Sequence, residues 1–205
     1  MTLLLSPEQA GRIRDAVRLV RYGGFVAFLA LLLSFVAEPA IYGFALGPIA
    51  FAFLAAATYP LLRPAGSGYA MAVAGLGLGA AIVEAIGVIA PTSTGSHLRV
   101  SSIFGAGTIG IGAWFVGFAA LSRDAVTIPL EITAKLMRGG LGFALIGAGW
   151  FIEDPTMSLA AIGGGLLLAN GVNPLFKYLR RYGLPDEPVA APKAVEAAPS
   201  EIAAG

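Results

Sequence analysis

The chain has 205 residues, of which 57% are hydrophobic and 12% are charged, and its mean hydropathy is +0.81. Soluble domains have about 45–50% apolar and about 25% charged residues, so a soluble fold of this size would leave too much apolar surface in water. A net charge of +1 does not indicate a nucleic-acid partner, and the absence of cysteine from the sequence excludes disulfides and thiolate chemistry. The composition predicts an all-α integral membrane protein.

Residues 1–22 are predicted to form a cytoplasmic amphipathic helix at the membrane interface. Ser6 is placed as its N-cap, Pro7 at the first helical position and Gln9 as the second member of a capping box. Apolar residues alternate with four arginines in the rest of the segment, and such arginines extend to the lipid headgroups. We expect this helix to run into the first membrane span.

Six apolar spans follow, at roughly 23–37, 41–62, 69–90, 102–121, 136–152 and 157–176. Crossing about 30 Å of hydrocarbon takes about 20 residues. The first and fifth spans are shorter than this without their flanking charges, so the basic turns before them would have to lie at the interface. The pattern predicts a six-helix membrane bundle.

One stretch occurs twice in the chain. Residues 23–39 read GGFVAFLALLLSFVAEP and residues 139–155 read GGLGFALIGAGWFIEDP, and the apolar runs that follow end in YPLLR and NPLFK. Each copy is interpreted as a Gly-rich hairpin of two helices with an acidic residue and a proline at its tip, while the middle pair of spans matches loosely. The chain then divides into hairpin 1 (23–63), hairpin 2 (64–122), an interfacial segment with hairpin 3 (123–181), and a Pro/Ala/Glu-rich tail (182–205).

The basic residues are distributed asymmetrically. Of the 13 Lys and Arg residues, Arg99 alone falls in the loops of one side of the predicted membrane. Because Lys and Arg are in excess on the cytoplasmic side, both termini are predicted to be cytoplasmic. The hairpin tips would then lie outside, where Glu38, Glu153 and Asp154 form an outer acidic rim. These carboxylates would either bind a cation or mark where the helices leave the membrane.

Glu84 is the one ionisable residue well inside a predicted span. A charged carboxylate is costly in the membrane, so Glu84 is a candidate for proton or ion coupling. The alternatives are a hydrated residue near the outer end of the span, or a protonated group in a hydrogen bond between helices. Asn170, in the inner part of the last span, is the second coupling candidate, and it would equally serve to cap or kink the helix end.

The sequence contains no recognisable catalytic motif. It has one histidine, His97, in a predicted outer loop, and no Ser-His-Asp set, HExxH or Walker sequence. We therefore expect neither an enzyme nor a metal site, and the sequence does not identify a cofactor.

Glycines are expected to set the helix contacts, because small residues let helices approach closely in lipid. The expected packing positions are Gly23, Gly24, Gly75, Gly79, Gly139 and Gly140.

Residues 137–179 resemble the HdeD-like short-repeat membrane proteins of bacteria. The shared features are a Gly-rich two-helix unit, a proline at its tip and a basic residue at its end. The resemblance implies six spans in three hairpins, and we expect a multi-pass protein in the cytoplasmic membrane of a prokaryote. It identifies no catalytic or binding residues in this chain.

The function expected from these features is that of a non-catalytic membrane scaffold or accessory subunit. It would pack its helices against other membrane protein subunits, or against itself in a homo-oligomer, and its remaining partner would be membrane lipid. The alternative is a small proton-coupled transporter or permeation protein that uses Glu84, together with Asn170.

Overall fold

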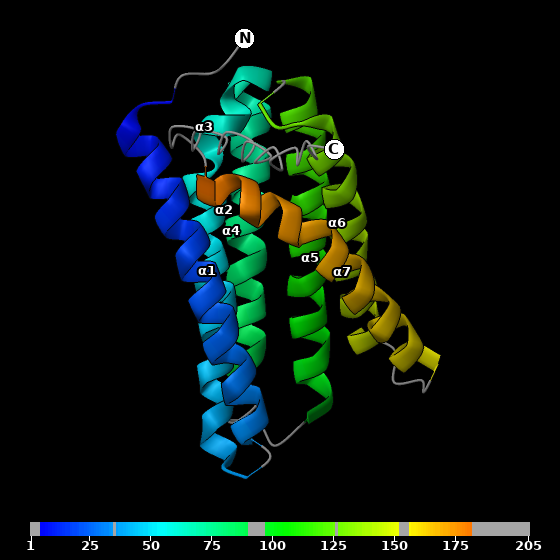
Figure 1. The fold of residues 1–205 in the computed structure, drawn as a ribbon. Helices are drawn as coiled ribbons and strands as arrows, with labels where there is room; N and C mark the ends of the chain where they lie inside the picture. Colours follow the sequence, from blue (N-terminus) through cyan, green and yellow to red (C-terminus); the bar gives the residue numbers. More distant parts are fainter. Residues whose placement is uncertain (1–4, 35, 90–96, 126, 152–155, 182–205) are drawn as a thin grey trace, which may run out of the picture.

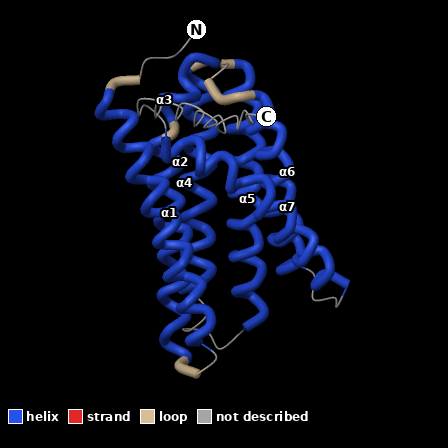
Figure 2. Tube along the Cα trace, viewed as in Figure 1, coloured by secondary structure: helices blue, strands red, loops and turns tan. Residues whose placement is uncertain are grey.

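The computed structural model describes residues 5–34, 36–89, 97–125, 127–151 and 156–181. Every regular element in these ranges is helical (Figure 2), so the all-α prediction is confirmed for this part of the chain. The elements are α1 (Pro7–Ser34), η1 (Glu38–Ala45), α2 (Leu46–Ala57), α3 (Tyr59–Leu62), η2 (Arg63–Ala65), α4 (Ser67–Ile89), α5 (His97–Asp124), α6 (Leu130–Phe151) and α7 (Thr156–Arg181).

The long helices form an up-and-down bundle in which consecutive helices lie side by side (Figure 1). Helix α1 packs on η1 and α2, α2 packs on α4, and the chain then continues through the neighbouring pairs α4–α5, α5–α6 and α6–α7. Helix α7 crosses the bundle obliquely, so that it also contacts α1. The start of α1, the α5–α6 connection and the end of α7 all lie towards the same end of the bundle.

Helix α1 combines the expected interfacial helix and the first expected span in one continuous helix of 28 residues. Its start is the predicted capping box: the Ser6 backbone N–H donates to the Gln9 side-chain oxygen at 3.1 Å, and the Gln9 backbone N–H donates to the Ser6 hydroxyl at 3.2 Å. Helix α6 likewise begins inside the expected interfacial segment, at Leu130, and continues without a break to Phe151.

Two helices in the described residues are long and apolar enough to cross a membrane. They are α4 and the part of α5 from Ile103 to Asp124. A third is added if Tyr42–Ala57 and Tyr59–Ala65, which are bent by 43° at a break, form one span. The structure therefore fits a membrane protein with two or three such spans. The remaining expected spans fall on α1, α6 and α7, and the total of six stays a prediction.

The bend between α2 and α3 has a local cause. Pro60 lacks a backbone N–H and its ring excludes the helical position of the Ala56 carbonyl, so the helix cannot continue unbroken. Thr58, which lies at the break, is fully buried and donates its hydroxyl to the Leu54 carbonyl oxygen at 2.9 Å. This hydrogen bond satisfies the buried hydroxyl without a partner from another helix.

An aromatic cluster fills the core around α5. The Trp114 ring lies 4.9 Å from the Phe51 ring of α2 and 5.0 Å from the Phe118 ring, measured between centroids. Phe115 stacks on Phe143 of α6 at 5.2 Å. Trp114, Phe115 and Phe118 are fully buried, so α5 is the central helix that joins the α2 side of the bundle to the α6 side.

Glycines bring the backbones of α5, α6 and α7 into direct contact. A Cβ at Gly112 of α5 would lie 2.5 Å from the carbonyl oxygen of Gly140 in α6. A Cβ at Gly164 of α7 would lie 2.6 Å from the carbonyl oxygen of Gly142, also in α6. Cβ atoms do not approach other atoms this closely, so only glycine allows these helices to pack at the observed separation.

The two glycines at the start of the first expected hairpin have different surroundings. A Cβ at Gly23 would lie 2.7 Å from the Ala50 Cβ and 3.0 Å from the Leu46 carbonyl oxygen, both in α2. A Cβ at Gly24 would meet no described atom within 4 Å. Gly23 therefore sets the contact between α1 and α2, whereas Gly24 takes no part in it.

This difference predicts opposite effects of the same substitution. Gly23→Ala should destabilise the fold by about 1–3 kcal/mol, because the added methyl group forces α1 away from α2. Gly24→Ala should be neutral or stabilise the helix by up to about 1 kcal/mol, because it replaces a helical glycine. Thermal unfolding of both variants in one detergent measures the two effects. A lower melting temperature for Gly24→Ala than for Gly23→Ala would contradict the described packing of α1.

Candidate functional site

Glu84 lies near the end of α4, about 7 Å before Ile89 at 1.5 Å per residue, and faces α5. The residue is buried, with 7% of its surface exposed. The Thr108 hydroxyl of α5 is 3.0 Å from the Glu84 Oε1 atom and also 3.0 Å from the Phe104 carbonyl oxygen. The carboxyl group predicted from the sequence as the coupling candidate is therefore bonded to the neighbouring helix.

The two contacts of Thr108 indicate whether the Glu84 carboxyl group carries a proton. A hydroxyl group has one hydrogen to donate, and here it has two acceptor oxygens at equal distance. Both contacts become full hydrogen bonds if Thr108 donates to the Phe104 carbonyl and a protonated Glu84 donates to Thr108. A neutral carboxyl also avoids the cost of burying a charge between two apolar helices. The geometry therefore favours a neutral hydrogen bond between α4 and α5.

The helices touch on both sides of this hydrogen bond, so little space remains around it. A Cβ at Gly107 would lie 2.5 Å from the backbone nitrogen of Glu84. A Cβ at Gly110 would lie 2.7 Å from the Ala80 Cβ, and a Cβ at Gly87 would lie 2.6 Å from the Phe104 nitrogen. Glu84 thus sits within a continuous glycine-lined contact of α4 with α5.

A second buried polar group lies in the same helix pair. The Trp114 Nε1 atom has no hydrogen-bond partner among the described residues. It faces α4 at Gly77, where an added Cβ would lie 2.8 Å from Nε1 and 2.5 Å from Cδ1 of the indole. The small residue at position 77 therefore makes room for the largest side chain of the core.

The other predicted coupling residue is placed apart from Glu84. Asn170 lies on α7 and is exposed, while Glu84 is buried between α4 and α5. The structure does not bring the two side chains together. Of the expected outer acidic rim, Glu153 and Asp154 lie outside the described residues, and for Glu38 only the backbone, at the start of η1, is described.

The expected packing glycines fall into two groups. Gly23 contacts α2, Gly139 contacts Val172 of α7, and Gly140 contacts Gly112 of α5. A Cβ at Gly24, Gly75 or Gly79 would meet no described atom within 4 Å. Helix α4 instead makes its close internal contacts through Gly77 and Gly87, which are not among the expected packing positions.

The end of the bundle that carries the start of α1 is strongly basic. Its described residues include eleven Lys and Arg but four Asp and Glu. Three ion pairs join neighbouring turns of single helices: Arg12–Glu8, Arg18–Asp15 and Lys135–Glu131. The hydrogen bond and the charge of Lys135 lower the pKa of the exposed Glu131 carboxyl below its usual value. In the part of the chain that the structure describes, no group of three or more His, Asp or Glu side chains is placed to hold a metal ion.

The contact of Glu84 with Thr108 predicts a specific pattern of stability. Thr108→Val keeps the shape of the side chain but removes the hydroxyl, and should cost about 0.6–2 kcal/mol, as interhelical hydrogen bonds in membranes do. Glu84→Gln should retain most of this stability, because a neutral amide still donates to Thr108. The measurement is thermal unfolding in detergent, with Glu131→Gln as the exposed control. A loss for Glu84→Gln larger than that for Thr108→Val would contradict a neutral hydrogen bond.

Comparison of the chain with models of protein families, with curated proteins and with solved structures found no match. The resemblance to the HdeD-like proteins over residues 137–179 therefore stays a prediction.

Proposed function

We propose that the chain is a non-catalytic integral membrane scaffold or accessory subunit, which works by packing its helices against other membrane protein subunits or against copies of itself. In this proposal the chain crosses the cytoplasmic membrane of a prokaryote six times in three hairpins, with both termini cytoplasmic. The proposal assigns no reaction and no transported substrate to the chain.

The proposal rests on the two faces of α4. The inner face uses Glu84 to bond Thr108 of α5, so the one carboxyl group of this helix serves an internal contact. The outer face presents Gly75 and Gly79, one helical turn apart and without a described neighbour within 4 Å. Exposed apolar side chains flank these glycines, among them Leu76, Leu78 and Ile82. A small-residue ridge on a helix that is apolar enough to span a membrane is the surface on which a second helix packs closely.

The six-span topology is supported by the placement of charge. The described Lys and Arg residues, apart from Arg99, lie in α1 up to its middle, in η2, around the α5–α6 connection and near the end of α7. The start of α1, the α5–α6 connection and the end of α7 lie towards one end of the bundle, as expected for the cytoplasmic side. The basic turns at the start of α1 and α6 are continuous with the apolar parts of these helices. The arginines would then reach the headgroups while the remaining turns cross the hydrocarbon.

The alternative is a proton-coupled transporter or permeation protein that uses Glu84. The observation that favours it is the burial of the Glu84 carboxyl group near one end of a helix that is long and apolar enough to span a membrane, since such residues often mark proton pathways. The exposed position of Asn170 on another helix gives this alternative no second group at the same place.

Assembly should depend on the outer ridge of α4. Gly75→Leu and Gly79→Leu should leave the monomer folded, because no described atom lies near either position, but should reduce the assembled fraction on the order of tenfold, the effect of about 1.4 kcal/mol. Gly68→Leu, in the first turn of the same helix and equally free of neighbours, is the matched control. Native mass spectrometry of protein extracted gently from its own membrane measures the assembled fraction. If Gly75→Leu and Gly79→Leu both assemble as the unmodified chain does, the outer face of α4 no longer supports the proposal.

Proton flux separates the two candidate functions. The purified chain in sealed vesicles should carry no more flux than empty vesicles, and Glu84→Gln should not change this result. Glu131→Gln, at an exposed carboxyl outside the expected spans, is the control. Flux that appears with the unmodified chain, persists in the control and disappears in Glu84→Gln would establish the transport alternative instead.

A further inference from the structure

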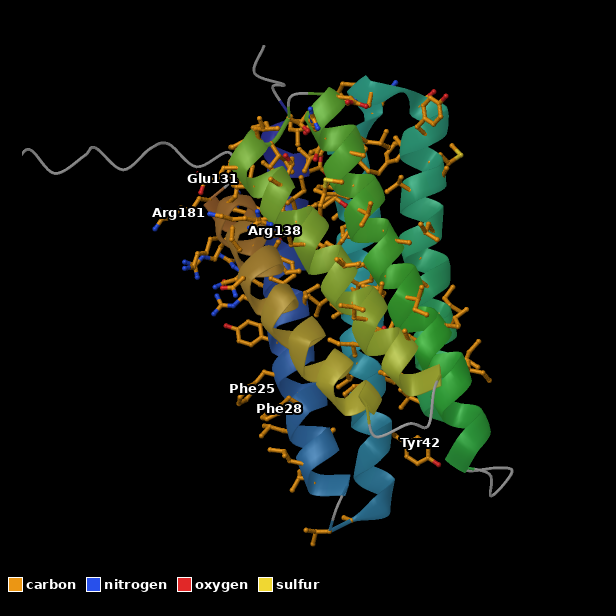
Figure 3. The ribbon with its side chains drawn as sticks, turned by 90° about the vertical axis from the view of Figure 1, so that its right-hand side faces the viewer. Phe25, Phe28, Tyr42, Glu131, Arg138 and Arg181 are labelled. Atoms are coloured by element: carbon orange, nitrogen blue, oxygen red, sulfur yellow. The ribbon has the colours of Figure 1, made fainter. Side chains whose placement is uncertain are left out.

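Exposed basic side chains lie on α1 and near the end of α7, two helices that contact each other. We call this surface the α1–α7 basic patch and define it as Arg21 of α1 with Lys177, Arg180 and Arg181 of α7. All four residues are exposed, and within the described residues no Asp or Glu forms an ion pair with any of them. Figure 3 shows the nitrogen atoms of basic side chains gathered beside the end of α7, where Arg181 is labelled.

Burial of apolar residues holds these cations together. Leu175 and Leu179 of α7 are fully buried in the same core cluster as Ile13 and Val17 of α1. Lys177, Arg180 and Arg181 lie within two residues of these leucines, so burial of the leucines holds three like charges at the end of α7 beside α1. Such charges repel one another unless an anion lies between them, and in water salt only partly screens the repulsion.

An exposed aromatic surface continues from the patch along α1. Phe25 and Phe28 are 61% and 54% exposed, and Figure 3 shows both pointing away from the bundle on the same side as Arg181 and below it. Phe28 follows Arg21 by seven residues, which places it on the same helix face about 10 Å further along the axis. Tyr22, which is 71% exposed, lies between them along α1. Along this part of α1 the groups therefore follow in the order cation, phenol and then hydrocarbon ring.

This order matches one half of a phospholipid bilayer. The headgroup region on each side of the hydrocarbon is about 5–8 Å thick, so a step of about 10 Å leads from the phosphates into the acyl chains. Tyrosine is enriched at the boundary between the two regions, and arginine and lysine just outside it. A free phosphate ion or an acidic peptide would satisfy the cations, but neither would cover Phe25 and Phe28.

We propose that the α1–α7 basic patch, with Phe25 and Phe28 below it, binds an anionic phospholipid of the cytoplasmic leaflet. The phosphate contacts Arg21 and the basic residues of α7, and the acyl chains lie along the exposed rings of α1. The lipid thereby neutralises the repulsion at the contact that joins the last helix of the bundle to the first. This inference rests on the proposed membrane location and on the proposed cytoplasmic side of this end.

The test compares lipids that differ only in charge. The full chain is placed in phosphatidylcholine bilayers with and without about 20% phosphatidylglycerol, and lipid retention is measured by native mass spectrometry together with the unfolding temperature. We expect preferential retention of phosphatidylglycerol and a higher unfolding temperature in its presence. In the variant with Arg21, Lys177 and Arg181 each changed to Gln, we expect the affinity for phosphatidylglycerol to fall on the order of tenfold or more.

A matched control separates this surface from general charge attraction. The variant with Arg12, Arg63 and Arg123 each changed to Gln loses the same charge at the same end of the bundle, but from outside the patch. It should retain phosphatidylglycerol as the unmodified chain does. Equal losses in the two triple variants would overturn the inference, and so would displacement of the lipid by millimolar inorganic phosphate. If the patch variant unfolds in phosphatidylcholine, the single variants Arg181→Gln and Arg123→Gln are compared instead. Arg181→Gln should lower the affinity for phosphatidylglycerol, by less than the triple variant does, and Arg123→Gln should leave it unchanged.

Failure of the lipid site can be told apart from failure of the proposed function. A chain that does not insert into either bilayer would contradict the membrane scaffold itself. A chain that inserts and assembles equally in both bilayers, without preference for phosphatidylglycerol, would overturn only the lipid site.

Discussion

The structure depends above all on the close approach of helix backbones through glycine. In the proposed membrane location, lipid supplies no hydrophobic force between two apolar helices, so van der Waals contact and a few polar bonds would hold them together. The contact of Gly112 with Gly140 joins α5 to α6, and the contact of Gly142 with Gly164 joins α6 to α7. The aromatic cluster around Trp114 fits between these contacts and α2. The bundle is consequently a series of neighbouring pairs arranged around α5.

The close approach of helix backbones also explains why the buried Glu84 carboxyl group bonds to the neighbouring helix. Where α4 and α5 touch, Gly107 leaves room for the backbone of Glu84 and little else, so the carboxyl bonds Thr108. A helix that satisfies its polar group internally can present an apolar outer face, and α4 does so around Gly75 and Gly79. The internal bond and the exposed apolar face are in this way two consequences of one helix pattern, and both support the proposed packing role.

Much of the local structure could be predicted from the sequence, because it depends on interactions within a few residues. The capping box at Ser6 and Gln9 and the all-α class are confirmed. Burial of Glu84 also agrees with the position expected for it inside a long apolar segment. Its partner Thr108 was not predicted, since it is 24 residues away and its own helix contains no other signal that selects it. Pairings between helices depend on their rotation, which a pattern of small residues does not determine.

The all-α class, the capped start of α1 and the asymmetry of charge follow from the sequence alone, because each depends on residue type and local spacing. Which glycines make contacts depends instead on how the helices pack. Gly23 is pressed against α2 while Gly24 is open, and Gly77 contacts Trp114 while Gly75 and Gly79 face outward. The oblique course of α7 also depends on the packing, and it brings the basic end of α7 to α1, the helix that carries Arg21. The reason is that glycines on different faces of a helix each allow a close neighbour. The packing of the other helices then selects the face that is used.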